Sequence, residues 1–409
     1  MRSWKAVTLT TAAKGYWVIG AMISTVITAR FLGPHGRGVI AAATSWVAMF
    51  VTFGHLSLAH VLVYLLGPRD RERIFPAVTG SVLVITGAIA LLGWSIAGAM
   101  QFISRGRAFQ HIPLSVLVVA FAGLPLLLWM ENGNSLLIVL GDLKRLNIAQ
   151  IAGTTTAILL VAFAVGVAKG GVTAALAATL ISYLVVTGMG LARILRHARP
   201  LSFSPTIARQ LLGGGARLHL SAVGSVFFTH AGVILLNLFR PVAETGYFQL
   251  AMQLTTATQV APMAAAVVAF SIVSRDGADG GWPEHRRLIV QTMLYAAVAA
   301  AGSYFLAPFV VPLLAGRNFA PAVSLFRILT LSVFGMSLGT VMAPQWVARG
   351  YFLQVTILVM VPAAIAVGGN ILLIPKFGMV AAAWMMVASY SIHMLGNLAF
   401  VWWIEARAR

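Results

Sequence analysis

Long apolar segments, separated by short clusters of charged residues, glycine and proline, run through the whole chain. A helix needs about 20 apolar residues to cross the hydrocarbon core of a bilayer. The pattern therefore predicts an all-α integral membrane protein with about 12 transmembrane helices, of which the longer ones are tilted or kinked. The segments lie near 13–32, 38–66, 75–103, 112–140, 146–168, 171–195, 217–239, 245–273, 287–313, 321–346, 352–374 and 378–404.

Composition agrees with this pattern. Of the 409 residues, 60% are hydrophobic and only 9% are charged, whereas about a quarter of the residues in soluble domains are charged. Such a chain could not cover a water-exposed surface, which excludes most soluble enzymes, disordered proteins and fibrous repeats. Cysteine is absent from the sequence, and this excludes disulfides and thiolate metal sites. We expect the basic start, 1–14, to be retained as part of the first helix, because no small-residue cleavage site follows it.

Lysine and arginine are distributed unevenly between alternate loops. With the N-terminus placed inside, the inner segments hold roughly two-thirds of the 28 lysines and arginines, while Arg37 and Arg30 are among the outer ones. This bias predicts cytoplasmic termini, since cytoplasmic loops are enriched in such residues. It also accounts for much of the net charge of +19. Nucleic acid is not an expected partner, because no basic soluble domain exists to bind it.

The two halves of the chain resemble each other. Gly171–Ala175 recurs as Gly378–Ala382, and Gly38 pairs with Gly246 at nearly the same offset. Each half has an even number of segments, so both copies insert with the same orientation and a pseudo-two-fold axis should run along the membrane normal, beside a central cavity. The expected domains are a six-helix lobe 1–196, a cytoplasmic linker 197–216 with a short amphipathic helix over 205–212, and a six-helix lobe 217–409.

Glu131 is the acidic residue that lies within an apolar segment, the fourth. A carboxylate at that depth could titrate and couple transport to an ion gradient. Pairing with a cation or a hydroxyl is the structural alternative. Both interpretations follow from the expense of burying an ionisable group in a bilayer.

Other polar residues offer contacts to an anion or to sugars. Arg30 and Arg327 could bind a diphosphate through charge-assisted hydrogen bonds, or place their charge at the outer interface. Arg217 opens the seventh segment on the inner side, where a lipid diphosphate would first arrive. Anchoring by the positive-inside rule explains this arginine equally well. The residues that could hydrogen-bond sugar hydroxyls, or bond across helices instead, are His230, Asn237, Gln249 and Gln253.

Motifs of enzymatic chemistry are weak or missing. Gly335–Gly339 fits the spacing of a hydrolase nucleophile elbow, but it lies in an apolar segment without the strand–turn–helix context. The sequence has no Gly-Lys dipeptide for a Walker loop and no HExxH pattern for zinc. We therefore expect no cofactor and no enzymatic activity. An integral glycan ligase or polymerase would need a catalytic acid or base in a large outer loop, and all the outer loops are short.

Four stretches carry a family resemblance: Thr28–Pro34 with Gly36 and Gly38, Glu244–Ala251, Leu313–Phe319 and Ile374–Ala383. With the segments and the repeat, they resemble the polysaccharide, or lipid-linked oligosaccharide, flippases of the multidrug/oligosaccharidyl-lipid/polysaccharide exporter (MOP) superfamily over nearly the whole chain. The resemblance implies a MATE-like fold. It also implies a bacterial cytoplasmic-membrane protein that flips a polyprenyl-diphosphate-linked oligosaccharide to the outer leaflet by alternating access, for surface polysaccharide synthesis.

The resemblance leaves three alternatives. Lipid II flippases usually add two spans and carry cations midway along the first helix, where this chain has Ser24, Thr25 and Thr28. Ion-coupled multidrug or cation antiporters often use an acidic residue in the first helix, which this chain lacks. A scaffold without transport activity is the third alternative. The expected partners are the polyprenyl-diphosphate-linked glycan, membrane lipids, and the polysaccharide polymerase and glycosyltransferases of the same polymer.

Overall fold

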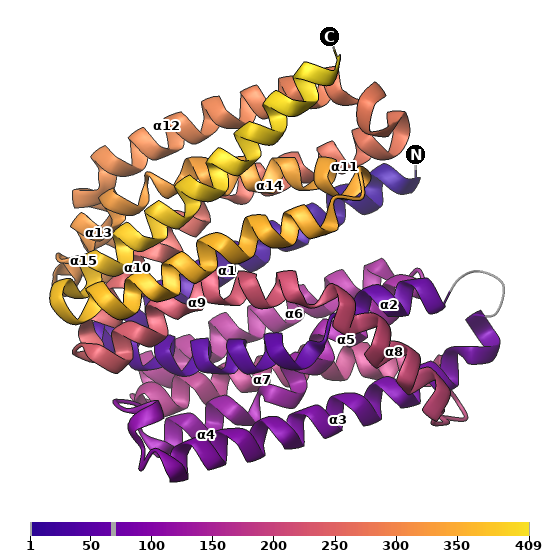
Figure 1. The fold of residues 1–409 in the computed structure, drawn as a ribbon. Helices are drawn as coiled ribbons and strands as arrows, with labels where there is room; N and C mark the ends of the chain where they lie inside the picture. The colour runs from indigo at the N-terminus through magenta and orange to yellow at the C-terminus, as the bar shows by residue number, and fades with distance from the viewer. Residues whose placement is uncertain (1, 67–70, 409) are drawn as a thin grey trace. The chain divides into compact units, whose positions relative to one another are not determined.

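The computed structural model describes the backbone of residues 2–66 and 71–408, and the side chains of 12–59, 61–62, 65–66, 72–215 and 219–406. Within these ranges the chain is helical almost throughout and has no strand (Figure 1). The elements, with two 3-10 segments (η1, η3) and one π segment (η2), are α1 (Arg2–His55), α2 (Leu58–Leu65), α3 (Arg71–Ile103), η1 (Arg107–Phe109), α4 (Leu114–Ala122), α5 (Leu124–Val139), α6 (Leu143–Ala162), η2 (Phe163–Val167), α7 (Gly171–His197), α8 (Pro205–Leu218), α9 (Leu220–Phe239), α10 (Val242–Ala257), α11 (Val260–Gly280), α12 (Trp282–Ala315), η3 (Arg317–Phe319), α13 (Ala322–Leu329), α14 (Ser332–Ala348) and α15 (Phe352–Ala408).

The number of spans agrees with the sequence prediction. In the described chain nine helices are long and apolar enough to cross a bilayer, and the bent pair α13 and α14 makes ten. Gly33 in α1 and Gly378 in α15 interrupt their helices with φ angles of +67° and +60°, which glycine adopts without a steric penalty. Figure 1 shows α15 folding back near its middle. Division at these two glycines turns the ten spans into twelve, which confirms the predicted fold class.

The chain forms two compact units. Unit 1 comprises Met1–Leu32 and Val39–Val226, and unit 2 comprises Gly33–Gly38 and Phe227–Arg409. In unit 1, α6 packs along α7, and α5 packs against α2, α3 and α7. The amphipathic helix expected in the linker is α8, and it packs on α2 and α3 of the same unit. In unit 2, α14 packs against α11, α12 and α15, while α10 packs against α13 and α15.

Gly38 and Gly246 form a reciprocal backbone contact in unit 2. A Cβ atom on Gly38 would lie 2.0 Å from the carbonyl oxygen of Val242, and one on Gly246 would lie 2.0 Å from the carbonyl oxygen of Pro34. Each carbonyl belongs to the residue four positions before the opposite glycine, so the contact is symmetric, as in an isologous two-fold interface. These are the two glycines that the internal repeat pairs. Their lack of a side chain lets the start of the second segment of α1 lie directly against α10.

Candidate functional site

Arg37 is buried in unit 2, with 8% of its surface exposed. Among the described side chains it is the only buried arginine, lysine, aspartate or glutamate. Its Nη2 donates a hydrogen bond to Oε1 of Gln253 on α10, at 2.9 Å. The sequence analysis placed Arg37 in an outer loop, because the apolar pattern ends there. Its burial follows from the close packing of Gly38 on α10, which hydropathy does not report.

Gln253 ends a polar row on one face of α10, formed with Thr245 and Gln249 at a spacing of four residues. Oγ1 of Thr245 and Oε1 of Gln249 are buried and accept no hydrogen bond from the described residues. Buried polar atoms without a partner are expensive in a folded protein and call for an explanation. The structure thus brings two of the predicted residues, Gln249 and Gln253, onto one face, with Arg37 bonded to Gln253.

The other candidates in unit 2 lie on different helices. His230 is half-buried and Asn237 is fully buried, both on α9. Arg327 is half-buried on α13, where its Nε donates to the carbonyl oxygen of Tyr304 at 3.1 Å. Its guanidinium carbon also lies 5.1 Å from the centroid of the Tyr304 ring. These contacts tie Arg327 to α12, and it is not part of the polar row.

In unit 1, Arg30 is exposed near the end of the first segment of α1, three residues before Gly33. Glu131 is also exposed, on the face of α5 that carries the exposed Ile138. Among the described residues no hydrogen bond or ion pair involves the side chain of Glu131, so the structure gives it no cation or hydroxyl partner. The side chain of Arg217 lies outside the described residues, and only its backbone, at the end of α8, is placed.

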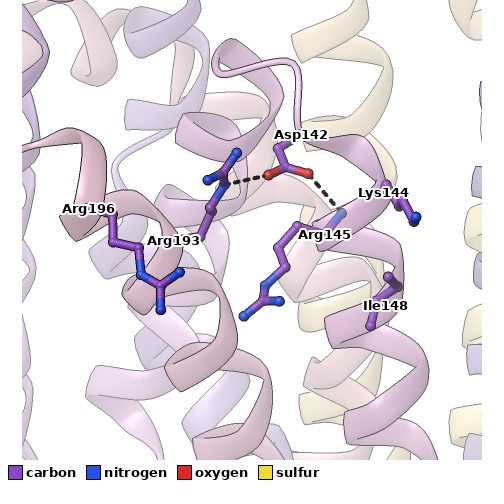
Figure 2. Close-up of a pocket in the computed structure, with 6 residues that line it drawn as sticks. All are labelled: Asp142, Lys144, Arg145, Ile148, Arg193 and Arg196. Atoms are coloured by element: carbon purple, nitrogen blue, oxygen red, sulfur yellow. Dashed lines mark hydrogen bonds and ion pairs between the residues drawn. The ribbon is translucent and has the colours of Figure 1, made fainter.

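A pocket of about 320 Å³ lies in unit 1, where α6 begins and α7 ends (Figure 2). The predicted orientation puts this end of both helices on the cytoplasmic side. Four cations line the pocket with one carboxylate and one apolar side chain, and we call this set the basic pocket. Its residues are Lys144, Arg145, Arg193 and Arg196, with Asp142 and Ile148.

Asp142 organises the basic pocket. It caps α6 by accepting a hydrogen bond from the backbone N–H of Arg145 at 3.1 Å, and it accepts a second one from Nε of Arg193 on α7 at 2.7 Å. The bond from Arg193 holds the pKa of the Asp142 carboxyl below its usual value, so the group is ionised at neutral pH. Nε of Arg145 donates to the carbonyl oxygen of Met189 at 3.3 Å. The side chains of Lys144 and Arg196 have no hydrogen bond or ion pair with the described residues.

In the sequence analysis these four cations counted only toward the excess of lysine and arginine in the inner segments. A signal for the pocket was nevertheless present, because a short connection joins the spans 146–168 and 171–195. Two antiparallel helices joined by a short loop bring the start of the first beside the end of the second. Charged residues at those two places therefore had to meet.

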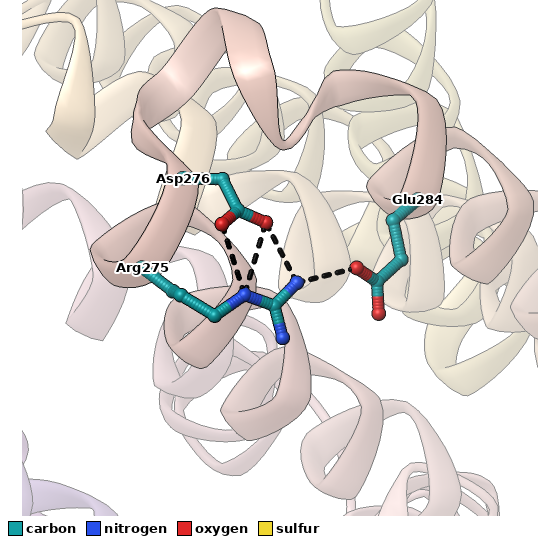
Figure 3. Close-up of polar contacts among 3 residues, drawn as sticks. All are labelled: Arg275, Asp276 and Glu284. Carbon is teal, nitrogen blue, oxygen red and sulfur yellow. Dashed lines mark hydrogen bonds and ion pairs between the residues drawn. The ribbon is translucent and has the colours of Figure 1, made fainter.

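The charged groups at the predicted inner end of unit 2 are arranged differently. Nη2 of Arg275 lies 2.6 Å from Oδ2 of Asp276 and 2.7 Å from Oε2 of Glu284 (Figure 3). Such exposed pairs contribute little stability individually, but they give each carboxylate an arginine. Each carboxylate at this end of unit 2 is therefore bonded to an arginine. The other pairs are Arg286–Glu405 and Arg349–Asp279.

Sequence comparison finds a match to one family. The profile of the family described as "Polysaccharide biosynthesis protein" matches residues 3–275. Among curated protein sequences, no significant match was found.

Solved structures share the fold over nearly the whole chain. A lipid II flippase MurJ in an inward closed conformation has a TM-score of 0.74 and 13% identity, over 96% of this chain and 87% of that one. An inward-facing multidrug resistance MATE family transporter of the MOP superfamily has a TM-score of 0.67 and 19% identity, over 98% and 94%. A MOP superfamily transporter from Pyrococcus furiosus has a TM-score of 0.56 and 18% identity, over 99% and 92%. These similarities confirm the MATE-like fold.

Proposed function

The chain belongs to the polysaccharide biosynthesis protein family, and we propose that it flips a polyprenyl-diphosphate-linked oligosaccharide from the cytoplasmic to the outer leaflet of the bacterial cytoplasmic membrane. The many apolar helices and the fold shared with membrane transporters support transport rather than catalysis. In this proposal both termini are cytoplasmic and the cargo crosses by alternating access. The polymerase and glycosyltransferases of the same surface polymer are its proposed partners.

The observation that carries the proposal is the buried Arg37 on the polar row of α10. A diphosphate is best recognised by charge-assisted hydrogen bonds from cations, and a buried arginine of a membrane protein is a candidate for such a contact. Oγ1 of Thr245 and Oε1 of Gln249 have no hydrogen-bond donor among the described residues, so each could accept a hydrogen bond from a sugar hydroxyl. In a cation antiporter, the positive charge of a buried arginine would repel the cationic cargo.

Deletion of the gene in its native host tests the function directly. We expect the complete oligosaccharide repeat unit to accumulate on its polyprenyl diphosphate carrier, with loss of the corresponding surface polymer. Mass spectrometry of the lipid-linked glycans identifies the cargo in the same experiment, and plasmid-borne wild-type protein should reverse both effects. Unchanged lipid-linked glycans together with new sensitivity to cationic dyes would reject the flippase and favour the multidrug antiporter.

Glu131 is the proposed coupling residue. The sequence has no Walker-type nucleotide-binding motif, so an ion gradient or the membrane potential is the proposed driving force for net transport. Glu131→Gln keeps the shape of the side chain and removes its ionisation. We expect the stimulation of transport by an imposed proton gradient to fall by about tenfold, a loss of about 1.4 kcal/mol. The measurement is flipping of a fluorescent polyprenyl-diphosphate glycan in proteoliposomes, with and without a pH step. Glu72→Gln, at an exposed position at the start of α3, is the matched control, and equal responses of the two variants would remove Glu131 from the coupling mechanism.

A further inference from the structure

The geometry of the basic pocket points to a second site for the same cargo: we propose that it binds the diphosphate of the lipid-linked oligosaccharide at the inner leaflet, before translocation. This inference rests on the proposed flippase function for the identity of the lipid. The pocket lies wholly within unit 1, between the start of α6 and the end of α7. It is therefore built without any residue of the polar row of α10, which belongs to unit 2.

The charge balance of the pocket favours a multiply charged anion. Four cations line it and Asp142 is the single carboxylate. Arg193 is bonded to that carboxylate (Figure 2). Arg145 is bonded to the backbone carbonyl of Met189, so both guanidinium groups are oriented. Lys144 and Arg196 keep all their donors for a ligand. A phosphodiester headgroup offers one negative charge, whereas a diphosphate offers at least two and more acceptor oxygens.

The surface next to the pocket suits a lipid rather than a free anion. Ile148 forms the apolar wall of the pocket and is 42% exposed, and Ile151, one turn further along α6, is 37% exposed. Because α6 is a membrane span, exposed isoleucines on it are positioned to contact hydrocarbon. A ligand with its diphosphate among the four cations can thus lay the first isoprene units along this face of α6. Basic pockets between spans on the cytoplasmic side are known to bind lipid headgroups of several charges.

The positive-inside rule explains cations at this end of the helices but not their arrangement. At the predicted inner end of unit 2, Arg275 is bonded to both Asp276 and Glu284 (Figure 3). Orientation in the membrane requires only that lysine and arginine be present. It does not require that four of them line one cavity with a single carboxylate.

The test measures binding of farnesyl diphosphate, a short isoprenoid diphosphate, to the full-length protein in phosphatidylcholine nanodiscs. The variant Lys144→Ala/Arg196→Ala removes the two unpaired cations and leaves every hydrogen bond of Asp142 and Arg145 in place. We expect its affinity for farnesyl diphosphate to fall by at least tenfold. The matched control, Arg209→Ala/Arg287→Ala, removes the same charge from exposed positions outside the pocket and should change affinity less than twofold.

Two further probes separate the sources of the anion. Inorganic diphosphate should bind the wild type more weakly than farnesyl diphosphate, and nanodiscs containing phosphatidylglycerol should leave farnesyl diphosphate binding nearly unchanged. Equal losses in both double variants, unchanged binding in Lys144→Ala/Arg196→Ala, or displacement by phosphatidylglycerol would each overturn the proposal. The flippase function is tested separately, by gene deletion. If binding depends on the pocket but deletion leaves the lipid-linked glycans unchanged, the flippase function is rejected and the pocket remains a site for a diphosphate lipid.

Discussion

Gly38→Ala is expected to prevent the chain from accumulating as a folded protein. The added Cβ would lie 2.0 Å from the carbonyl oxygen and 2.9 Å from the carbonyl carbon of Val242. Both atoms are backbone, so the clash cannot be relieved by rotating a side chain, and α10 would have to move away from α1. Alanine usually stabilises a helix by about 0.5–1 kcal/mol relative to glycine. Here we expect a net destabilisation above about 4 kcal/mol, a size that single substitutions reach only through severe effects such as overpacking or backbone strain.

The measurement is the yield of monodisperse protein after detergent extraction, followed by its thermal unfolding. Gly246→Ala should give the same result, because its Cβ would lie 2.0 Å from the carbonyl oxygen of Pro34. Gly302→Ala is the matched control: it lies within α12, and apart from the adjacent backbone of its own helix no atom lies within 4 Å of an added Cβ. If Gly38→Ala were as stable as Gly302→Ala, the reciprocal contact between α1 and α10 would not exist as described.

The spans could be predicted from the sequence because their signal is local. The thickness of the bilayer requires a minimum run of apolar residues, and each run is read without knowing its neighbours. The breaks within α1 and α15 are local as well, since Gly33 is followed by Pro34, a residue suited to the first position of a helix, and Gly378 follows a lysine and a phenylalanine. The expected number of spans therefore agrees with the structure once α1 and α15 are divided at these glycines.

The functional residues depend on which helix faces meet, and that information is not local. Arg37 lies where hydropathy places a loop, and it is buried next to the contact of Gly38 with α10. Lys144 and Arg196 satisfy the positive-inside rule at their own positions, so nothing in either segment alone indicates a shared pocket. Arg327 lies in the first part of a bent span, α13 and α14, but its contact with Tyr304 of α12 could not be read from that segment alone.

Removal of the charge of Arg37 is expected to separate stability from transport. Arg37→Met alone removes the hydrogen bond from Nη2 to Oε1 of Gln253, and loss of one partner of a buried hydrogen bond costs about 1–3 kcal/mol. Arg37→Met/Gln253→Met replaces both partners with apolar side chains of similar length. Because exchange of a buried polar pair for apolar groups of the same shape is often neutral or stabilising, we expect the double variant to unfold at the wild-type temperature or above.

Transport should not recover with stability. A charge-assisted hydrogen bond contributes about 1.5–3 kcal/mol, so loss of the guanidinium contact to a diphosphate should slow flipping by about 10- to 100-fold. The measurement is the ratio of lipid-linked repeat unit to surface polymer in a deletion strain that carries each variant, with Gln253→Met alone as the control that keeps the cation. If Arg37→Met/Gln253→Met restored the polymer together with the thermal stability, Arg37 would have only a structural role. The flippase proposal would then lose the observation that carries it.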